Sequence, residues 1–391
     1  MMNKVEEVIN LKKIIKHIDK PLFFTSMLLF IIGLIMIFSS SNITAFMKYG
    51  ASPYNYLIKQ SIFLIISFIL ATFMIKFNTK FYGIISWVLV IGITIMLGVL
   101  LVVGELKNQA ISWYDFGFFS FQPSEFAKVI MIVWMARYYE ANKKNLDKYG
   151  SSLFPLLVGG IIAFLIIFQP DLGTAIIFSL IVFCIFLAVP ISKEIKTKIF
   201  VTFFGLVIVV LLFLVGSGKT IIYERQLERL NFTRPCDRLL DTGNQVCNGY
   251  IAINNGGLFG VGLGNSTQKY LYLPEAHTDF IYAIIIEELG LIFGIGILLL
   301  YIFLLYRILK IGKESYTDRG ATMCYGIALY IFLHIAVNLM GLFGLMPMTG
   351  VPLPFMSYGG SFTLCLIASL AIVQRVSVEN GLRKEKQENR K

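Results

Sequence analysis

Residues 153–190 decide the fold, and they read LFPLLVGGIIAFLIIFQPDLGTAIIFSLIVFCIFLAVP. Asp171 is the only charged residue in this stretch, and Gln169-Pro170-Asp171-Leu172 separates two apolar runs, at 153–169 and 173–190. An apolar run of about 20 residues is long enough to cross ~30 Å of hydrocarbon as a helix. Because these runs are apolar on every side, they indicate two membrane-spanning helices joined by a tight turn.

The rest of the chain repeats this pattern. Of its 391 residues, 57% are hydrophobic and 15% are charged, whereas a soluble domain carries roughly a quarter charged residues. The sequence therefore predicts a single all-α integral membrane domain with about ten transmembrane helices. We place them near 22–40, 57–75, 81–104, 122–138, 153–169, 173–190, 197–216, 280–305, 322–343 and 360–376. The fourth is the weakest, because Glu125, Lys128 and Arg137 interrupt it.

The distribution of positive charge predicts the orientation. With the N-terminus inside, the inner segments carry 24 of the 34 Lys and Arg residues and the outer segments carry nine. Inner segments of membrane proteins are enriched in Lys and Arg, so both ends (1–21 and 377–391) are expected in the cytoplasm. The net charge of +11 is thus interpreted as a topology signal, and nucleic-acid binding is not expected.

The charged tail from Glu379 to Lys391 is predicted to be disordered. No clear cleavage site follows the first predicted span, so we predict that this span is retained as a membrane anchor.

Residues 217–278 form a long extracellular loop between the seventh and eighth predicted helices. The loop is rich in aromatic residues and glycine, so we expect it to fold against the outer mouth of the helix bundle. Its stretch GGLFGVGLG, at 256–264, lacks the strand and βαβ unit that a dinucleotide site needs, and is interpreted as a tight turn. Cys236 and Cys247 share this loop, where a disulfide and two free thiols are both open.

Glu275, His277 and Asp279 stand within five residues just before the eighth predicted helix. Such a group can supply a general base or hold a divalent cation such as Mg²⁺ or Mn²⁺. The alternative is structural: Thr278 or Asp279 caps the helix that follows. Spacing alone does not choose between these interpretations.

Four other residues, at three places in the sequence, are candidates for chemistry at the predicted outer surface. Glu125 and Lys128 are i,i+3 neighbours that either stabilise the bundle as an ion pair or line a polar groove. Asp171 is either a turn residue or part of a site shared with Glu125 and Asp279. Trp113 either lies in the interfacial aromatic belt or contacts a substrate.

Five motifs in order resemble the SEDS family (FtsW, RodA, SpoVE), and the likeness covers roughly residues 20 to 378. They are Gln122–Lys128, Gln169–Thr174, Ile253–Gly264, Tyr272–Phe280 followed by Glu287-Glu288-Leu289-Gly290, and Thr349–Ser361. The resemblance implies ten helices and a glycosyltransferase that polymerises lipid II into peptidoglycan on the outer face of the bacterial plasma membrane. It also implies a class B penicillin-binding protein as transpeptidase partner, in division, elongation or sporulation. Glu287–Gly290 leans toward the division or sporulation branches.

The resemblance also assigns roles to individual residues. It implies that Asp279 is catalytic, and it maps functionally important family positions onto Trp113, Glu125, Lys128 and Asp171. We predict that these four residues, together with Glu275, His277 and Thr278, bind substrate. Two departures concern the loops: Ser112 stands where family members often have Arg, and residues 233–248 are not typical of the family.

As a mechanism, we expect Asp279 to activate the 4-hydroxyl of a lipid-linked disaccharide. The departing pyrophosphate calls for cations, from Lys128, Arg225, Arg229, Arg234 and Lys269, or from a divalent ion. Two other function classes compete with this enzyme. One is a flippase for lipid-linked sugars, which intramembrane charges also suit, and the other is a scaffold without chemistry of its own.

Overall fold

The structure is a computed structural model that describes residues 11–103, 112–117, 119–202, 235–237 and 242–390. Its regular structure is helical apart from one antiparallel ribbon, in which β1 (Tyr114–Asp115) pairs with β2 (Ser120–Phe121). The helices are α1 (Leu11–His17), α2 (Lys20–Tyr49), α3 (Asn55–Met74), α4 (Thr79–Val103), α5 (Pro123–Ala141), η1 (Lys143–Asn145), α6 (Tyr149–Phe168), α7 (Leu172–Ala188), η2 (Pro235–Asp237), α10 (Thr242–Gly256), α11 (Ile281–Lys313), α12 (Asp318–Leu342) and α13 (Gly360–Glu388).

Seven of the helices in the described ranges are long and apolar enough to cross a membrane: α2, α3, α4, α6, α11, α12 and α13. The apolar α7 is shorter, and α5 is interrupted by charges. Within the described part of the chain, nine of the ten predicted spans coincide with a helix. The remaining one, 197–216, falls mostly outside the described residues. The predicted all-α architecture is confirmed.

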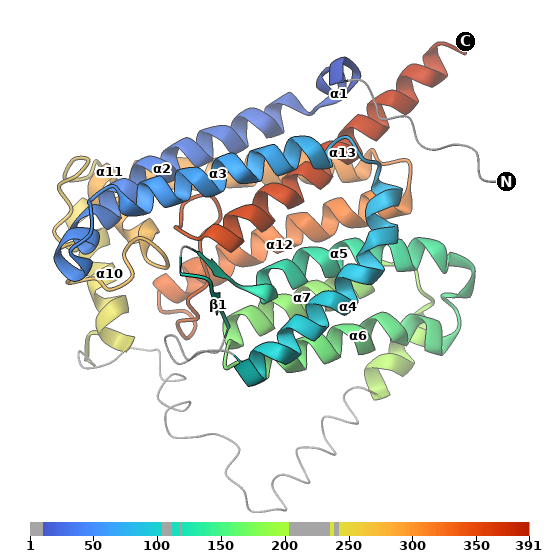
Figure 1. Cartoon of the computed structure of the whole chain (residues 1–391), viewed down its shortest axis with the longest axis horizontal. Coiled ribbons are helices and arrows are strands. Elements are labelled where there is room, and N and C mark those ends of the chain that lie inside the picture. Colours follow the sequence, from blue (N-terminus) through green and yellow to red (C-terminus); the bar gives the residue numbers. More distant parts are fainter. Residues whose placement is uncertain (1–10, 104–111, 118, 203–234, 238–241, 391) are drawn as a thin grey trace, which may run out of the picture.

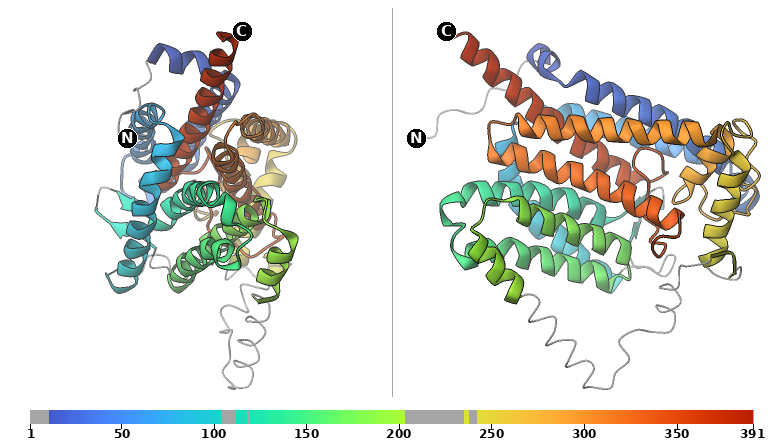
Figure 2. Two further views of the ribbon diagram at one scale, coloured as in Figure 1. Left: turned by 90° about the vertical axis from the view of Figure 1, so that its right-hand side faces the viewer. Right: turned by 180° about the vertical axis from the view of Figure 1, so that it is seen from behind.

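The long helices run side by side along the long axis of the molecule (Figures 1 and 2). Helix α1 and the end of α13 lie together at one end, which we call the terminal end. The turn between α2 and α3, helix α10 and the β1–β2 ribbon lie at the opposite end, which we call the loop end. The first and the last described helices therefore lie together at the same end of the bundle. Which side is cytoplasmic stays a prediction.

Helix α3 shows how the sequence sorts its faces in this fold. Its buried residues are Gln60, Leu64, Ser67 and Ala71, which are spaced three or four apart and therefore form one stripe. The stripe faces α13, where Gln60 Nε2 donates to Thr363 Oγ1 at 2.8 Å. The remaining surface of α3 is half-buried or exposed and mostly apolar, as lipid contact requires, whereas the small and polar residues mediate contact between helices.

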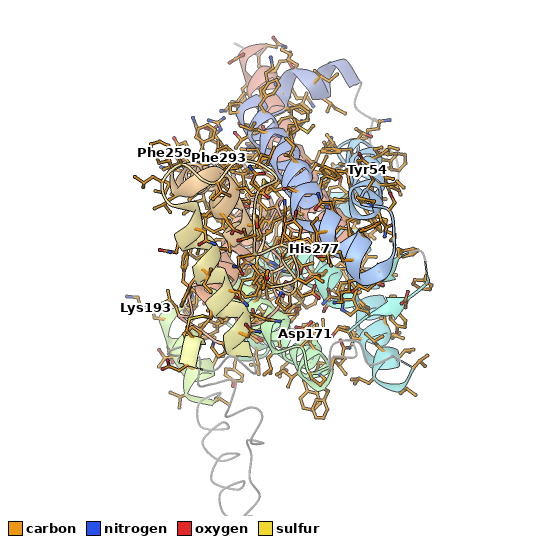
Figure 3. All side chains as sticks on the ribbon, turned by 90° about the vertical axis from the view of Figure 1, so that its left-hand side faces the viewer. Tyr54, Asp171, Lys193, Phe259, His277 and Phe293 are labelled. Atoms are coloured by element: carbon orange, nitrogen blue, oxygen red, sulfur yellow. A yellow bond between two sulfur atoms is a disulfide. The ribbon has the colours of Figure 1, made fainter. Side chains whose placement is uncertain are left out.

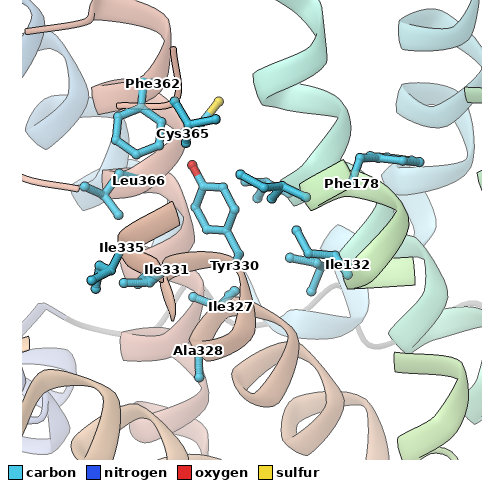
Figure 4. Close-up of a cluster of buried hydrophobic side chains, with 14 of the residues drawn as sticks. Ile132, Phe178, Ile327, Ala328, Tyr330, Ile331, Ile335, Phe362, Cys365 and Leu366 are labelled. Carbon is cyan, nitrogen blue, oxygen red and sulfur yellow. The ribbon is translucent and has the colours of Figure 1, made fainter. Parts of the chain in front are cut away.

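Helix α5 lies at the centre of the bundle and packs against α4, α7, α12 and α13. Figure 4 shows Tyr330 of α12 between Ile132 of α5 on one side and Phe362 and Cys365 of α13 on the other, all of them buried. Because protein surrounds α5, its charged residues Glu125 and Lys128 face neighbouring helices instead of lipid. This explains why a helix with so weak an apolar signal can stand within the membrane bundle.

The C-terminal tail is helical, so the prediction of disorder from Glu379 onward is wrong. Helix α13 continues to Glu388. Glu385 accepts from Lys16 Nζ at 2.7 Å and lies 3.1 Å from Nε2 of His17, which joins the tail to α1. Closer to the bundle, Arg375 Nε donates to Glu379 at 3.1 Å. Contacts between the two ends of the chain therefore order a segment whose composition alone suggests disorder.

The glycine-rich stretch at 256–264 is a turn that docks on a break in α11. The backbone has positive φ at Gly260 (80°) and at Gly290 (87°), where α11 is interrupted. Only glycine adopts such angles readily. The two segments also approach too closely for side chains, since a Cβ on Gly260 would lie 2.3 Å from the carbonyl oxygen of Glu288. The prediction of a tight turn thus fits, and the turn locks the loop onto α11.

Helix α10 packs along α11 and is tied to η2 by a disulfide between Cys236 and Cys247. Among the alternatives left open by the sequence, the structure therefore contains the disulfide. In the described part of the chain, Cys184, Cys324 and Cys365 are free thiols. Part of the predicted loop, residues 217–234 and 238–241, lies outside the described residues.

Replacing both Cys236 and Cys247 by serine is expected to lower the free energy of local unfolding of this segment by about 2–3 kcal/mol, because the crosslink limits the freedom of the open state. The rate of limited proteolysis within residues 235–256 measures this change. Cys184→Ser, which removes a free thiol on α7, is the control. Unchanged cleavage in the double variant would show that packing on α11 holds the segment without the crosslink.

Candidate active site

Asp279 lies at the loop end, in a turn directly before α11. Thr278 Oγ1 donates within this turn, to the carbonyl oxygen and to Oε2 of Glu275, at 3.1 Å each. Helix α11 begins at Ile281, and its N-cap Phe280 makes no side-chain capping bond. The expectation that Thr278 or Asp279 caps this helix is therefore wrong. The carboxyl group of Asp279 therefore does not cap α11, and it is available to act as a base.

The backbone of this turn is held by three consecutive carbonyl groups. The carbonyl of His277 accepts from the amide of Tyr358 at 3.0 Å, and that of Thr278 accepts from Ser357 Oγ at 2.6 Å. The carbonyl of Asp279 accepts from Asn338 Nδ2 at 2.9 Å. The segment before α13 and one residue of α12 thus fix the position of Asp279, as preorganised catalysis requires.

His277 is a buried part of this support. Figure 3 shows it near the middle of the loop end. Its ring centroid lies 4.5 Å from that of Tyr56 and 6.0 Å from that of Tyr358. Burial lowers the pKa of His277 below its usual value, so the imidazole is neutral at pH 7. Its geometry favours packing of the turn over contact with a charged substrate group.

The carboxyl group of Asp279 faces a small pocket. The lining includes Asn338 and Leu342 of α12, and Met348, Thr349 and Gly350 of the following segment. A Cβ on Gly350 would lie 3.4 Å from Oδ2 of Asp279. Burial, together with the negative charge of Glu275, raises the pKa of Asp279 to about 7. A carboxyl group with this pKa exists in both protonation states near neutral pH, which suits a general base.

Polymerisation is therefore expected to increase as pH rises through about 7, because only the ionised Asp279 can accept a proton. Glu275→Gln should shift this midpoint to lower pH, since it removes one of the two causes that raise the pKa. Initial rates across a pH series test both statements. A profile that is flat around pH 7 in the wild type would contradict the assignment of Asp279 as the base.

A second polar cluster lies between α5 and α12. Lys128 Nζ lies 2.8 Å from Glu125 Oε1 and 2.9 Å from His334 Nε2. The side chains of Lys128 and Glu125 are 0% and 2% exposed, so this ion pair is enclosed by protein. Between the two predicted alternatives for Glu125 and Lys128, the geometry favours the ion pair over an open groove.

Asp171 serves two partners at once. Its side chain caps α7 by accepting from the amide of Thr174 at 3.1 Å, and it also accepts from Gln122 Nε2 at 3.1 Å. Gln122 directly precedes α5, so Asp171 joins the start of α7 to the start of α5. A Cβ on Gly173 would lie 2.6 Å from Cβ of Thr349, which brings the start of α7 against the segment that contains Gly350. Both predicted roles of Asp171, turn and shared site, fit this placement.

In the described part of the chain, the contacts of two other predicted residues, Trp113 and Lys269, do not involve Asp279. Trp113 is half-buried just before β1, and in the described part of the chain no hydrogen bond or ring contact joins it to Asp279, Glu125 or Asp171. Lys269 is buried against Glu288, with 2.9 Å between Nζ and Oε1. It is therefore not free to bind pyrophosphate, contrary to expectation. The remaining cation candidates, Arg225, Arg229 and Arg234, lie outside the described residues.

Two residues of this region were missed by sequence reasoning: His334 and Asn338, both on α12. They are four positions apart in an apolar span, and a buried polar pair at helical spacing could have identified them. As for a metal, the described residues contain no group of three His, Cys, Asp or Glu side chains that could hold one.

The fold and the site define an all-α membrane protein with a fixed, half-buried carboxyl group at one end of its bundle and buried charges inside. Residues 19–382 match the family model for FtsW, RodA and SpoVE, described as cell cycle proteins. The chain belongs to this family. It is therefore a multi-pass membrane protein.

Individual relatives cover nearly the whole chain. It is 36% identical over 387 residues to a probable peptidoglycan glycosyltransferase FtsW of Bacillus subtilis, with 96% of this chain and 95% of the relative covered. It is 35% identical to stage V sporulation protein E of the same organism, with 92% and 96% covered. Two solved structures share the fold at 24% identity. One is described as a peptidoglycan synthase complex (TM-score 0.72; 93% and 98% covered), and the other is Thermus thermophilus RodA (TM-score 0.65; 92% and 96% covered).

Proposed function

We infer that this chain is a peptidoglycan glycosyltransferase of the SEDS family that acts in cell-wall synthesis. We place its reaction at the loop end, on the outer face of the plasma membrane, with lipid II as substrate. The observation that carries this proposal is the Asp279 turn: its carboxyl group is not used in capping, its backbone is clamped, and its pKa is about 7. A role in division or sporulation is favoured, since FtsW proteins and a sporulation protein are among its relatives.

In this mechanism, the carboxylate of Asp279 accepts the proton of the 4-hydroxyl of one lipid-linked disaccharide. The resulting oxygen attacks the anomeric carbon of the growing glycan, and the bond from that carbon to pyrophosphate breaks. Direct displacement inverts the anomeric centre. Because pyrophosphate leaves without protonation, one carboxylate suffices, whereas glycoside hydrolysis normally uses an acid as well.

The charge of the leaving pyrophosphate must be met by cations. In this structure Lys128 is fully buried and paired with Glu125 and His334, so direct contact with pyrophosphate would require its release from this pair. Its proposed role here is to hold Glu125 and the start of α5 in place beside Asp171. A divalent cation bound together with the substrate, or the arginines outside the described residues, would then meet the pyrophosphate charge.

A class B penicillin-binding protein is the proposed partner, because the glycan strands made here need crosslinking. A solved structure with the same fold is described as coordinating polymerisation and crosslinking in a peptidoglycan synthase complex. The charge distribution supports an orientation with the terminal end in the cytoplasm.

The deciding experiment is polymerisation of purified lipid II in detergent by the purified chain together with its penicillin-binding partner. Glycan strands made without any membrane to cross would support the enzyme over a flippase, for which the buried charges between α5 and α12 would also be suitable. Transport of lipid II across vesicle membranes, with no polymer in detergent, would overturn the proposal.

A further inference from the structure

Helix α12 presents three buried polar side chains in one row. Tyr330, His334 and Asn338 are 0%, 0% and 5% exposed, and their spacing of four residues places them along the same side of the helix. Polar groups inside a membrane bundle are costly and commonly mark function.

His334 acts as a hydrogen-bond acceptor for Lys128. Its Nε2 lies 2.9 Å from Lys128 Nζ, and its ring stacks on Phe362 with 4.7 Å between centroids. An ammonium group has only donors. Within the Glu125–Lys128 ion pair, Nε2 must therefore hold a lone pair, and the imidazole is neutral with its proton on Nδ1. The stacking on Phe362 fixes the plane of the ring and thus the direction of that lone pair.

Asn338, one turn further along, holds the Asp279 side of the site. Its two amide hydrogens are used by the carbonyl oxygens of Asp279, at 2.9 Å, and Val351, at 2.8 Å. These bonds fix the turn that carries the proposed base, and also the segment containing Gly350 beside its carboxyl group. Neighbouring positions on one rigid helix therefore bind the two polar clusters of the site.

We propose that His334 is a positioning residue for glycan polymerisation, which sets the place of Lys128, and through it Glu125, relative to Asp279. This rests on the proposed function of Asp279. Polar contacts join Asp171 to Gln122 at the start of α5, Glu125 to Lys128 and Lys128 to His334, and Asn338 to the Asp279 turn. The helices α5 and α12 themselves connect these contacts, from Gln122 to Glu125 and from His334 to Asn338. His334 is thus a polar link between α12 and α5, in addition to their apolar packing.

The test compares three variants in the polymerisation assay with purified lipid II and the penicillin-binding partner. His334→Leu removes the acceptor and should lower kcat about tenfold or more with little change in KM, since positioning acts on the reacting geometry. His334→Gln keeps an acceptor oxygen and should recover most of the rate. Tyr330→Phe is the matched control on the same face, because the hydroxyl of Tyr330 has no hydrogen-bond partner among the described residues.

A thermal-unfolding cycle in detergent separates positioning from general destabilisation. In a background of Glu125→Gln with Lys128→Met the ammonium group is absent, so His334→Leu should lower Tm by less than about a third of its effect in the wild type. Equal rates for the Leu and Gln variants, or equal Tm losses in both backgrounds, would overturn the proposal. Two further results are independent of His334: full activity of Asp279→Asn would refute the assignment of Asp279 as the base, and wild-type protein that makes no polymer would refute the proposed function itself.

Discussion

Replacing Asp279 by asparagine is expected to reduce the rate of glycan polymerisation by about 10³-fold, within the range that loss of a general base produces. Asparagine has nearly the shape of aspartate but cannot accept the proton of the 4-hydroxyl. The carbonyl of residue 279 would still accept from Asn338, and the pocket beside Gly350 would keep its size. The loss should therefore appear in kcat, with binding of lipid II little changed.

Gel separation of glycan strands made from lipid II measures this loss, and thermal unfolding of the purified variant shows whether it is folded. Glu275→Gln, assayed well above pH 7 where Asp279 is ionised with or without the charge of Glu275, is the matched control, since Glu275 is part of the same turn and bonds to Thr278 but is not the proposed base. A folded Asp279→Asn variant that polymerises at the wild-type rate would remove Asp279 from the mechanism.

The second large effect is on stability. Lys128→Met should destabilise the protein by about 3–5 kcal/mol, because it leaves Glu125 buried without its cation. Replacing Glu125 by glutamine as well should restore most of this loss, since no uncompensated charge then remains. A neutral pair of similar volume is often as stable as a buried ion pair.

Thermal unfolding of the two single variants and the double variant measures this pattern. The polymerisation assay on the same variants shows whether the Glu125–Lys128 pair also affects the reaction. We expect the double variant to be stable yet to have a markedly lower rate, because nothing then holds the start of α5 through His334. A double variant with full activity would show that Glu125 and Lys128 stabilise the bundle and have no part in the reaction.

Much of the fold could be predicted because each membrane span is a local property of the sequence. Apolar runs such as 153–169 and 173–190 are long enough to cross the bilayer regardless of their neighbours, and the structure has α6 and α7 at these places. The prediction of disorder after Glu379 was wrong for the opposite reason, since the structure of this tail is not a local property of the sequence. Its order comes from contacts with Lys16 and His17, which lie at the far end of the sequence.

The residues of the candidate site were likewise predictable where their signal is local in the sequence, and were missed where it depends on the fold. Asp279 stands out through the charged group around it and through a family motif, and its polar surroundings were visible in the sequence. His334 and Asn338 were missed because a search for apolar runs treats the polar residues inside them as interruptions. Lys269 was misjudged, because its pairing with Glu288 depends on how the glycine-rich turn docks on α11.

The length of helix α13 connects the two ends of the bundle mechanically. It contains 29 residues, so it is about 43 Å long, which exceeds the ~30 Å of hydrocarbon. One end follows directly on Ser357 and Tyr358, which clamp the Asp279 turn, and the other emerges beside α1. It is thus one rigid rod from one end of the bundle to the other, so a protein that binds its protruding end binds the same helix to which the Asp279 turn is attached.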